Sequence, residues 1–269
     1  MIGIGLNIGN RVMGGGGGFD ADAQAFFDRV TTAGGTLSTT EKTATNQLVL
    51  DMKSAGIWSS MKAVYPMVGA SAAACAQNLK SSSFTGTFSS GWTFASTGVT
   101  GNGTSAYFDT TLTPSVSIAS QDSVSISYYS RSNITTAVDF GVRVTTPLTI
   151  IIAGTCNDTG STYFRLNHGL GESSAGNSGS SLKNYIYNRV SSTTESVFIN
   201  ATKTSSTKST SGNASLPIFL NAYNNLGSPS NYSNRQCAMF TIGDGLTDTQ
   251  ASNFYTAVQA FQTTLSRQV

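Results

Sequence analysis

The chain opens with strict alternation of aliphatic and small or polar residues. An alternation with a period of two places the aliphatic side chains on one face of an extended segment. These side chains belong to Ile2, Ile4, Leu6 and Ile8. An isolated strand is unstable and needs the edge of a sheet, and the five glycines of residues 14–18 predict a flexible spacer behind it. The pattern indicates a docking arm on a tether; pairing with the chain's own sheet is the alternative.

Helical periodicity follows the glycine run. Apolar residues recur at helical spacing from Ala23 to Val30, and two glycines end this segment. Ser38 and Glu41 stand at the spacing of a capping box, ahead of a second apolar stripe that runs to Ala55. We expect these two short helices to form a hairpin over residues 19–56. Their apolar faces are small and should cover a larger surface.

From residue 57 onwards the apolar period shortens towards two, which predicts β-strands. Short, half-apolar runs are separated by Gly, Asn, Ser or Pro. The expected strands cover residues 63–69, 106–108, 123–130, 138–144, 148–153, 163–166, 182–188, 195–201 and 218–223. This number of strands fits a jelly roll better than an immunoglobulin domain. The sequence predicts a mainly β fold with a two-sheet sandwich over residues 57–245.

The last segment returns to a helical pattern. Thr247 and Gln250 form a second capping-box motif, and apolar and aromatic residues then repeat at three and four up to Leu265. We expect residues 246–269 to form a helix that packs on the body. The predicted organisation is therefore an arm and tether (1–18), a helical hairpin (19–56), a sandwich (57–245) and a C-terminal helix (246–269).

Charge is scarce in this chain. Charged residues make up 10% of the sequence and the formal net charge is +2, whereas an average soluble protein has about 25% charged residues. The surface must consist mainly of Ser, Thr, Asn and Gly, and it offers no basic stripe for nucleic acid or an anionic membrane. No apolar run reaches the roughly 18 residues of a membrane span. We therefore expect neither nucleic acid nor a membrane as a partner.

Metal and cofactor chemistry also find little support in the sequence. Cys75, Cys156 and Cys237 are far apart, and His168 is the single histidine. A zinc site needs four suitably spaced ligands, so we interpret the three cysteines as buried, reduced hydrophobic residues. Possible calcium ligands such as Asp158 and Asp244 stand in separate loops without an oxygen-rich run. We expect no metal and no cofactor.

Two kinds of catalytic site find little support in the sequence. A retaining glycosidase needs two carboxylates about 5–5.5 Å apart, but Glu41 is a helix cap, Glu172 lies in a predicted loop and Glu195 lies near a strand start. His168 falls in a predicted exposed turn, and no Gly-x-Ser-x-Gly motif accompanies it. We therefore expect no enzyme, with a glycoside hydrolase as the less favoured alternative.

Four stretches resemble structural proteins of tailed and other bacterial viruses, in which a helical lead-in precedes a concanavalin A-like, laminin-G-like sandwich. They are GIWSSMKAVYPMVG (56–69), QNLK (77–80), YFDTTLTP (107–114) and IGDGLTDTQ (242–250). The resemblance implies a non-enzymatic fibre, spike or decoration protein of a phage virion, made in the host cytoplasm. It also implies a homo-oligomer that binds other virion proteins, here through the N-terminal arm, and that contacts host glycans in some members.

Sugar recognition is the remaining candidate chemistry. Shallow sugar sites combine an aromatic platform with short amide and hydroxyl groups. Aromatic residues that stand beside many asparagines and hydroxyl residues are Trp92, Tyr107, Tyr163, Tyr223 and Tyr232. We list them as glycan-contact candidates, although aromatics at this spacing also serve as core residues. A cellular lectin-like module is the alternative to a virion protein.

Overall fold

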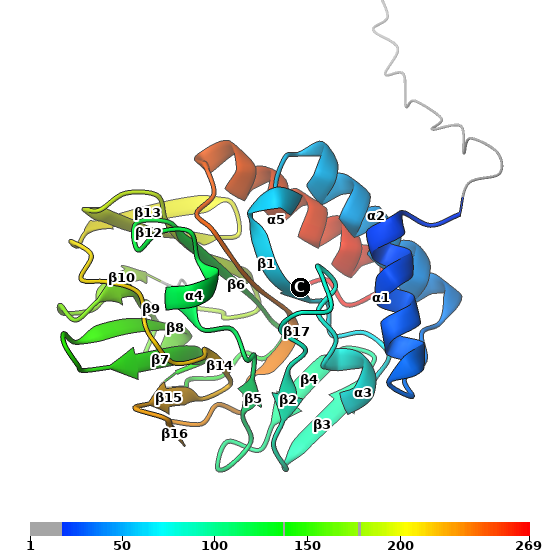
Figure 1. Cartoon of the computed structure of the whole chain (residues 1–269), viewed down its shortest axis with the longest axis horizontal. Helices are drawn as coiled ribbons and strands as arrows, with labels where there is room; N and C mark the ends of the chain where they lie inside the picture. Colours follow the sequence, from blue (N-terminus) through cyan, green and yellow to red (C-terminus); the bar gives the residue numbers. More distant parts are fainter. Residues whose placement is uncertain (1–17, 137, 177–178) are drawn as a thin grey trace, which may run out of the picture.

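The computed structural model describes residues 18–136, 138–176 and 179–269. The predicted docking arm, with Ile2, Ile4, Leu6 and Ile8, and residues 14–17 of the tether lie outside the described residues. Within the described part, two β-sheets pack face to face, and the long helices lie together on one side of the sandwich (Figure 1).

The first sheet has eight strands in the described chain and contains the central strand β17. Its strand order is β13 (Thr202–Thr207), β12 (Thr194–Ile199), β11 (Asn184–Arg189), β6 (Val124–Ser130), β17 (Gln236–Gly243), β4 (Gly98–Gly101) and β3 (Trp92–Ala95). All neighbours are antiparallel. β1 (Met61–Tyr65) also pairs with β17, alongside its second half, so β17 has three partners.

The second sheet has nine strands in the same part of the chain. Its order is β10 (Ser173–Gly176), β9 (Ser161–His168), β8 (Ile150–Asp158), β7 (Phe140–Val144), β14 (Phe219–Leu220), β5 (Phe108–Asp109) and β2 (Thr87–Phe88). β15 (Tyr223–Asn225) runs parallel beside β7, and β16 (Ser228–Ser230) pairs with β15. The chain therefore passes β7 twice on the same side, first as β14 and then as β15.

The main core lies between the two sheets. Alternate residues of each strand point inwards, and those of the second sheet include Phe140, Val142 and Ile152. They meet inward residues of the first sheet such as Tyr187 and Phe240, and Phe140 contacts the Tyr187 ring edge-on at 5.0 Å between centroids. The intervening residues of the second sheet therefore point to its outer face.

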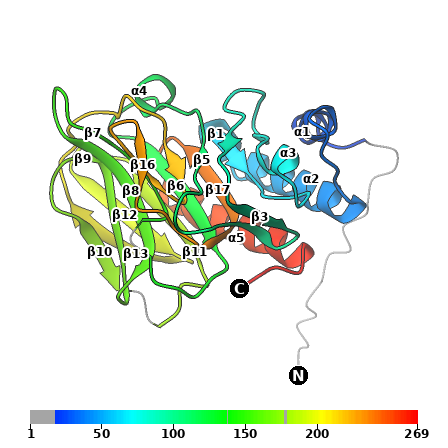
Figure 2. The same ribbon diagram turned by 90° about the horizontal axis from the view of Figure 1, so that it is seen from below.

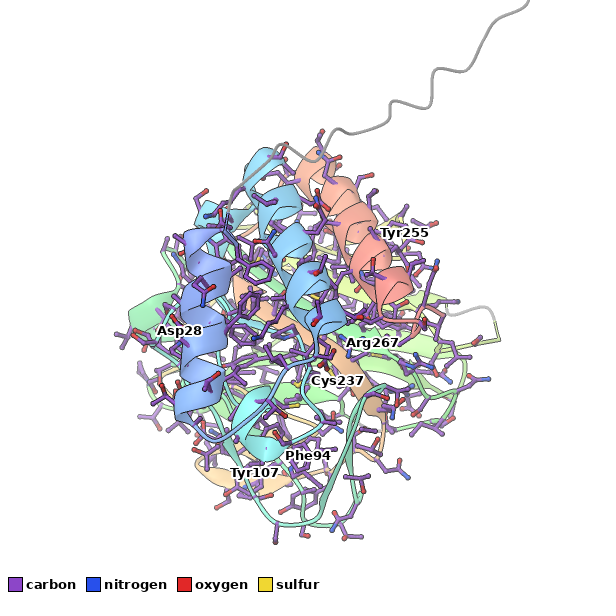
Figure 3. All side chains as sticks on the ribbon, turned by 90° about the vertical axis from the view of Figure 1, so that its right-hand side faces the viewer. Asp28, Phe94, Tyr107, Cys237, Tyr255 and Arg267 are labelled. Atoms are coloured by element: carbon purple, nitrogen blue, oxygen red, sulfur yellow. The ribbon has the colours of Figure 1, made fainter. Side chains whose placement is uncertain are left out.

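The outer face of the first sheet is covered by helices. α1 (Ala21–Thr32), α2 (Thr39–Ser54) and α5 (Asp248–Thr264) lie side by side there, as Figures 2 and 3 show. They build a second core in which Leu48, Met52 and Phe254 meet Phe198 and Met239 of the sheet. Both predicted capping boxes, at Ser38 and at Thr247, are confirmed. Two single-turn helices, α3 (Ala72–Cys75) and α4 (Pro114–Ser117), and the 3-10 turn η1 (Trp58–Ser60) complete the helical elements described.

The C-terminal tail is fixed by a buried guanidinium. Arg267 donates to the carbonyl oxygens of Pro66 (2.6 Å), Met67 (2.8 Å) and Ala238 (2.9 Å), so it ties the residues after α5 to the end of β1 and to β17. Burial lowers the pKa of Arg267 to about 10. Figure 3 shows it below the end of α5, near Cys237.

The predicted fold class is confirmed: a mainly β, concanavalin A-like sandwich with an N-terminal helical hairpin and a C-terminal helix. The predicted strands omit the edge strands β10 and β13, whose sequences are almost entirely polar, and they also omit β3, β4, β16 and the largely apolar central strand β17. Cys75, Cys156 and Cys237 are buried thiols, as expected. Among the described residues, no helix is both long and apolar enough to cross a membrane.

Candidate functional site

None of the long helices described packs on the outer face of the nine-stranded sheet. All three long helices lie against the other sheet, on the opposite side of the sandwich (Figure 2). A rigid sheet without a helical cover is a common platform for ligands, because its side chains are held at fixed spacing. The residues that point outwards from β7, β8 and β9 are therefore candidates for ligand binding.

Strand register places these outward residues in rows. Arg165 of β9 stands opposite Ala153 of β8, and Ala153 stands opposite Gly141 of β7. Directly opposed residues of neighbouring strands share a face, so these three residues form one row across the sheet. Tyr163 lies two residues before Arg165, and Arg143 lies two residues after Gly141, so both also point outwards.

Tyr223 covers the middle of this face. β15 places it beside Gly141 in parallel register, and a Cβ atom at position 141 would lie only 2.6 Å from Cδ2 of the Tyr223 ring. The missing side chain of Gly141 is what allows the ring to rest on the backbone of β7. A second aromatic pair lies further along the same sheet, where Tyr107 stacks on Phe219 with 4.8 Å between ring centroids.

The charged groups of this face are loosely paired. Arg165 Nη2 lies 3.6 Å from Glu172 Oε1, which is beyond a normal hydrogen bond, and Glu172 is 51% exposed. Arg165 Nε is buried and has no hydrogen-bond partner among the described residues. Arg143 Nη1 lies 3.5 Å from Asn225 Oδ1, at the limit of a hydrogen bond. Both guanidinium groups therefore keep donors that the protein does not engage tightly.

The Tyr223 hydroxyl lies within electrostatic reach of these groups. Burial raises the pKa of Tyr223 to about 12; the cations Arg165 and Arg143 oppose this rise, and the anion Glu172 adds to it. At neutral pH the phenol is therefore uncharged, and its O–H is a hydrogen-bond donor and acceptor among two cations and one carboxylate.

We call this group of residues the outer-face cluster. It consists of the side chains of Arg143, Tyr163, Arg165, Glu172 and Tyr223 over a floor of Gly141 and Ala153. Part of it lines a small depression, together with Val138 and Thr155. The cluster combines aromatic rings, guanidinium donors and a carboxylate on small floor residues. This is the chemistry of a shallow site for a polar, ring-shaped ligand.

The structure separates the five aromatic candidates. Tyr163 and Tyr223 belong to the outer-face cluster, and Tyr107 lies on the same sheet against Phe219. Trp92 packs against the main core, and its Nε1–H donates to the Tyr107 carbonyl oxygen at 3.2 Å. The Tyr232 hydroxyl donates to the carbonyl oxygen of Pro229 at 3.1 Å. Trp92 and Tyr232 are thus engaged in local structure.

Sequence reasoning did not single out the arginines or the floor residues of the cluster. The segments FGVRV (140–144) and YFRL (163–166) each place a single arginine among strongly apolar strand residues. In a strand with a period of two, such a charge marks the solvent side. That pattern was available in the sequence, whereas the pairing of β8 with both β7 and β9 was not.

The prediction of an exposed turn at His168 is wrong. His168 ends β9, is fully buried, and its Nε2 lies 2.9 Å from Glu195 Oε1. Its Nδ1 accepts the backbone N–H of Leu170 at 3.2 Å, so the ring proton lies on Nε2 and is donated to Glu195. The strand extends to His168, into the predicted turn, across a register shift between Ile151 and Ile152 of β8.

Glu195 is the centre of a buried polar network. It also accepts the hydroxyl of Ser173 (2.6 Å), the backbone N–H of Leu166 (2.8 Å) and Nη2 of Arg189 (3.1 Å). Every side chain in this network is essentially inaccessible to solvent. Glu195 therefore links β9, β10, β11 and β12 at one end of the sandwich, whereas Glu172 lies at the surface beside Arg165.

A larger hollow than the depression at the outer-face cluster lies elsewhere, between the start of α2 and the end of α5. It has a volume of about 470 Å³ and is lined mainly by hydroxyl residues together with Glu41. The Glu41 carboxylate already accepts the backbone N–H groups of Ser38 (2.8 Å) and Gly69 (2.7 Å). Glu41 is thus committed to capping α2, and the hollow has no aromatic wall. The outer-face cluster offers more recognition chemistry.

No three His, Cys, Asp or Glu side chains gather to hold a metal ion anywhere in residues 18–136, 138–176 and 179–269. This statement covers Asp158 and Asp244, which the sequence had placed in separate loops.

Comparison with known proteins adds only distant structural neighbours. No protein-family model and no curated protein sequence matches the chain. Mouse laminin alpha1 domains LG4-5 share 18% identity over 45% of this chain and 34% of that chain, with a TM-score of 0.34. Trypanosoma rangeli sialidase in complex with sialic acid shares 10% identity over 63% and 29% of the two chains, with a TM-score of 0.44. Domain 4 of AbnA, a GH43 extracellular arabinanase from Geobacillus stearothermophilus, in complex with arabinotriose, shares 15% identity over 72% and 98%, again with a TM-score of 0.44.

These neighbours concern the fold and correct one prediction. The chain spans about a third of the length of the laminin fragment and 29% of the sialidase. The prediction that the chain is not an enzyme is contradicted, because the neighbours include sialidases and a domain of an arabinanase. The predicted phage virion origin gains no support from them. The described chain is a two-sheet β-sandwich, to which these neighbours are distantly similar.

Proposed function

We propose that this chain is a carbohydrate-binding protein and that a glycan binds at the outer-face cluster. The observation that carries the proposal is the position of Tyr223, whose ring rests on Gly141 beside the loosely paired Arg143 and Arg165. Sugars present an apolar C–H face and a rim of hydroxyl groups, so an aromatic ring with nearby polar donors recognises both features.

The fold favours such a site energetically. Tyr163 and Tyr223 are partly exposed and lie on paired strands, so little side-chain freedom remains to be lost when a ligand binds. Ala153 keeps the floor low beside the Tyr223 ring, which itself rests on Gly141. A sugar ring placed there would contact an aromatic wall and would reach guanidinium donors from the same position.

The virion role remains a prediction from the sequence. In a virion protein, the outer-face cluster would contact glycans of the host surface while the N-terminal arm binds other virion proteins. In a cellular lectin-like module the same face would serve the same purpose without the arm.

A glycan array with the full-length protein tests the proposal. We expect selective binding, and we expect Tyr223→Ala to weaken it by about tenfold or more, equivalent to about 1.4 kcal/mol. Gly141→Ala should also weaken binding, because the new methyl group would push the Tyr223 ring off the strand. The matched control is Tyr255→Ala on α5, on the opposite side of the molecule (Figure 3).

Thermal unfolding of each variant shows whether the fold is retained. The proposal is overturned if the array shows no selective binding. It is equally overturned if folded Tyr223→Ala and Gly141→Ala proteins bind the same glycans as strongly as the Tyr255→Ala control.

A further inference from the structure

We propose that the bound glycan is acidic and that Arg143 and Arg165 bind its carboxylate. This inference rests on the proposed function, since it names the chemical class of sugar that the outer-face cluster takes. It begins from the loose pairing of the two arginines on this face.

Two buried arginines of this protein, Arg235 and Arg189, are saturated with partners. Arg235 forms an ion pair with Asp139 through Nε (2.9 Å), and both of its Nη atoms donate to further oxygens. Arg189 donates to Glu195 and to the carbonyl oxygens of Leu166 and Lys208. These bonds satisfy the guanidinium donors, so neither arginine has capacity left for a ligand.

Arg165 and Arg143 are different. Arg165 has one loose ionic contact, to Glu172 at 3.6 Å, and its Nε has no partner in the described chain. Arg143 has one long contact, to Asn225 at 3.5 Å. A guanidinium group presents five N–H donors in a planar fork that matches a carboxylate. Each arginine therefore has donors available on the face where Tyr163 and Tyr223 stand.

The local charge favours an anion. The cluster contains two arginines and one glutamate, so it carries a net positive charge on a protein surface that has few charges. A neutral sugar can use the two guanidinium groups only as hydrogen-bond donors, without an opposite charge of its own. A sugar carboxylate gains charge-assisted hydrogen bonds from them.

Glu172 then acts as an internal competitor. In the free protein it lies beside Arg165, and at 51% exposure it is free to swing into solvent. An incoming carboxylate would replace it and form the shorter contact. It follows that removing the Glu172 charge should strengthen the binding of acidic sugars, a direction that a purely structural ion pair does not predict.

Matched ligand pairs test the inference in titration calorimetry with the full-length protein. The probes are oligogalacturonate with its methyl ester, and 3′-sialyllactose with lactose. We expect at least one acidic member to bind about tenfold more tightly than its neutral partner, with an affinity that falls as salt rises. Arg165→Gln and Arg143→Gln should each weaken acidic binding by about tenfold and leave neutral binding within about twofold. Glu172→Gln should strengthen acidic binding by about threefold.

Two controls separate charge from folding. Lys203→Gln removes the same charge from β13 in the other sheet and should leave all affinities unchanged. Arg165→Lys keeps the charge but loses the fork, so it should retain part of the acidic preference.

If acidic and neutral members bind equally, and the arginine variants change both alike, the acidic inference is wrong while the proposed function stands. If none of the four probes binds but the array identifies other neutral glycans, the inference fails alone; if the array also shows nothing, both fail.

Discussion

Glu172 and Glu195 show how the role of one residue type depends on its neighbours. The sequence placed Glu172 in a loop and Glu195 near the start of a strand, and both positions are correct. It could not reveal that Glu195 meets His168 and Arg189, because that contact depends on which strands pair. The same limit hid the outer-face cluster, whose members come from separate strands and a loop.

At this scale we predict that Glu195→Gln lowers the free energy of unfolding by about 3–5 kcal/mol, because Arg189 would keep a buried charge without an anionic partner. Chemical denaturation measures the change. The control is Glu172→Gln, whose exposed contact with Arg165 should contribute less than about 1 kcal/mol. Equal losses in the two variants would show that the buried network does not stabilise the fold as argued.

At the scale of elements, sequence patterns predicted the elements that local interactions determine. The capping boxes predicted the starts of α2 and α5, and perfect alternation predicted β6. Strands such as β13 were not predicted. Its sequence, TKTSST, has no apolar face, and the strand forms only because it pairs with β12. The position of His168 was predicted wrongly for a related reason. The strand extends to His168 across a register shift in the β8–β9 pair, and no local sequence pattern indicates that shift.

The second prediction concerns the start of α5. Thr247→Ala removes the hydroxyl that accepts the N–H of Gln250 at 3.2 Å, and it should destabilise the protein by about 1 kcal/mol. Thr256→Ala serves as the control, because Thr256 lies exposed within the same helix and alanine is the better helix former there. Thermal unfolding should rank the two variants in that order; a Thr247→Ala protein as stable as wild type would argue against the cap.

At the scale of the whole molecule, the number of strands and the resemblance predicted a sandwich. They did not predict which sheet would keep an outer face without helices. The sequence indicated that the helices cover a larger apolar surface without saying which sheet provides it. That choice depends on Phe198 and Met239 of the first sheet, whose outward apolar side chains bind the helices. The second sheet carries Arg143 and Arg165 at equivalent outward positions and stays uncovered by helix.

The third prediction concerns residues 1–13, most of which the sequence interprets as the docking arm. Deleting them should leave a folded body with an unchanged unfolding midpoint, because every core residue of the described chain lies beyond this segment. The truncated protein should fail to incorporate into virus particles if the arm anchors it. Normal incorporation, detected by blotting purified particles, would rule out the anchoring role.

The place of β17 in the sheet has a consequence for synthesis in the cell. β17 lies near the end of the chain in sequence but in the middle of its sheet, with β6 on one side and β4 and β1 on the other. While the ribosome is still making the earlier segments, β1, β4 and β6 each have an open edge facing the gap that β17 will fill. Such edges pair readily with the wrong strand or with another chain. A nascent chain that stalls before residue 236 would therefore be a strong substrate for chaperones, and closure of the sheet awaits translation of β17.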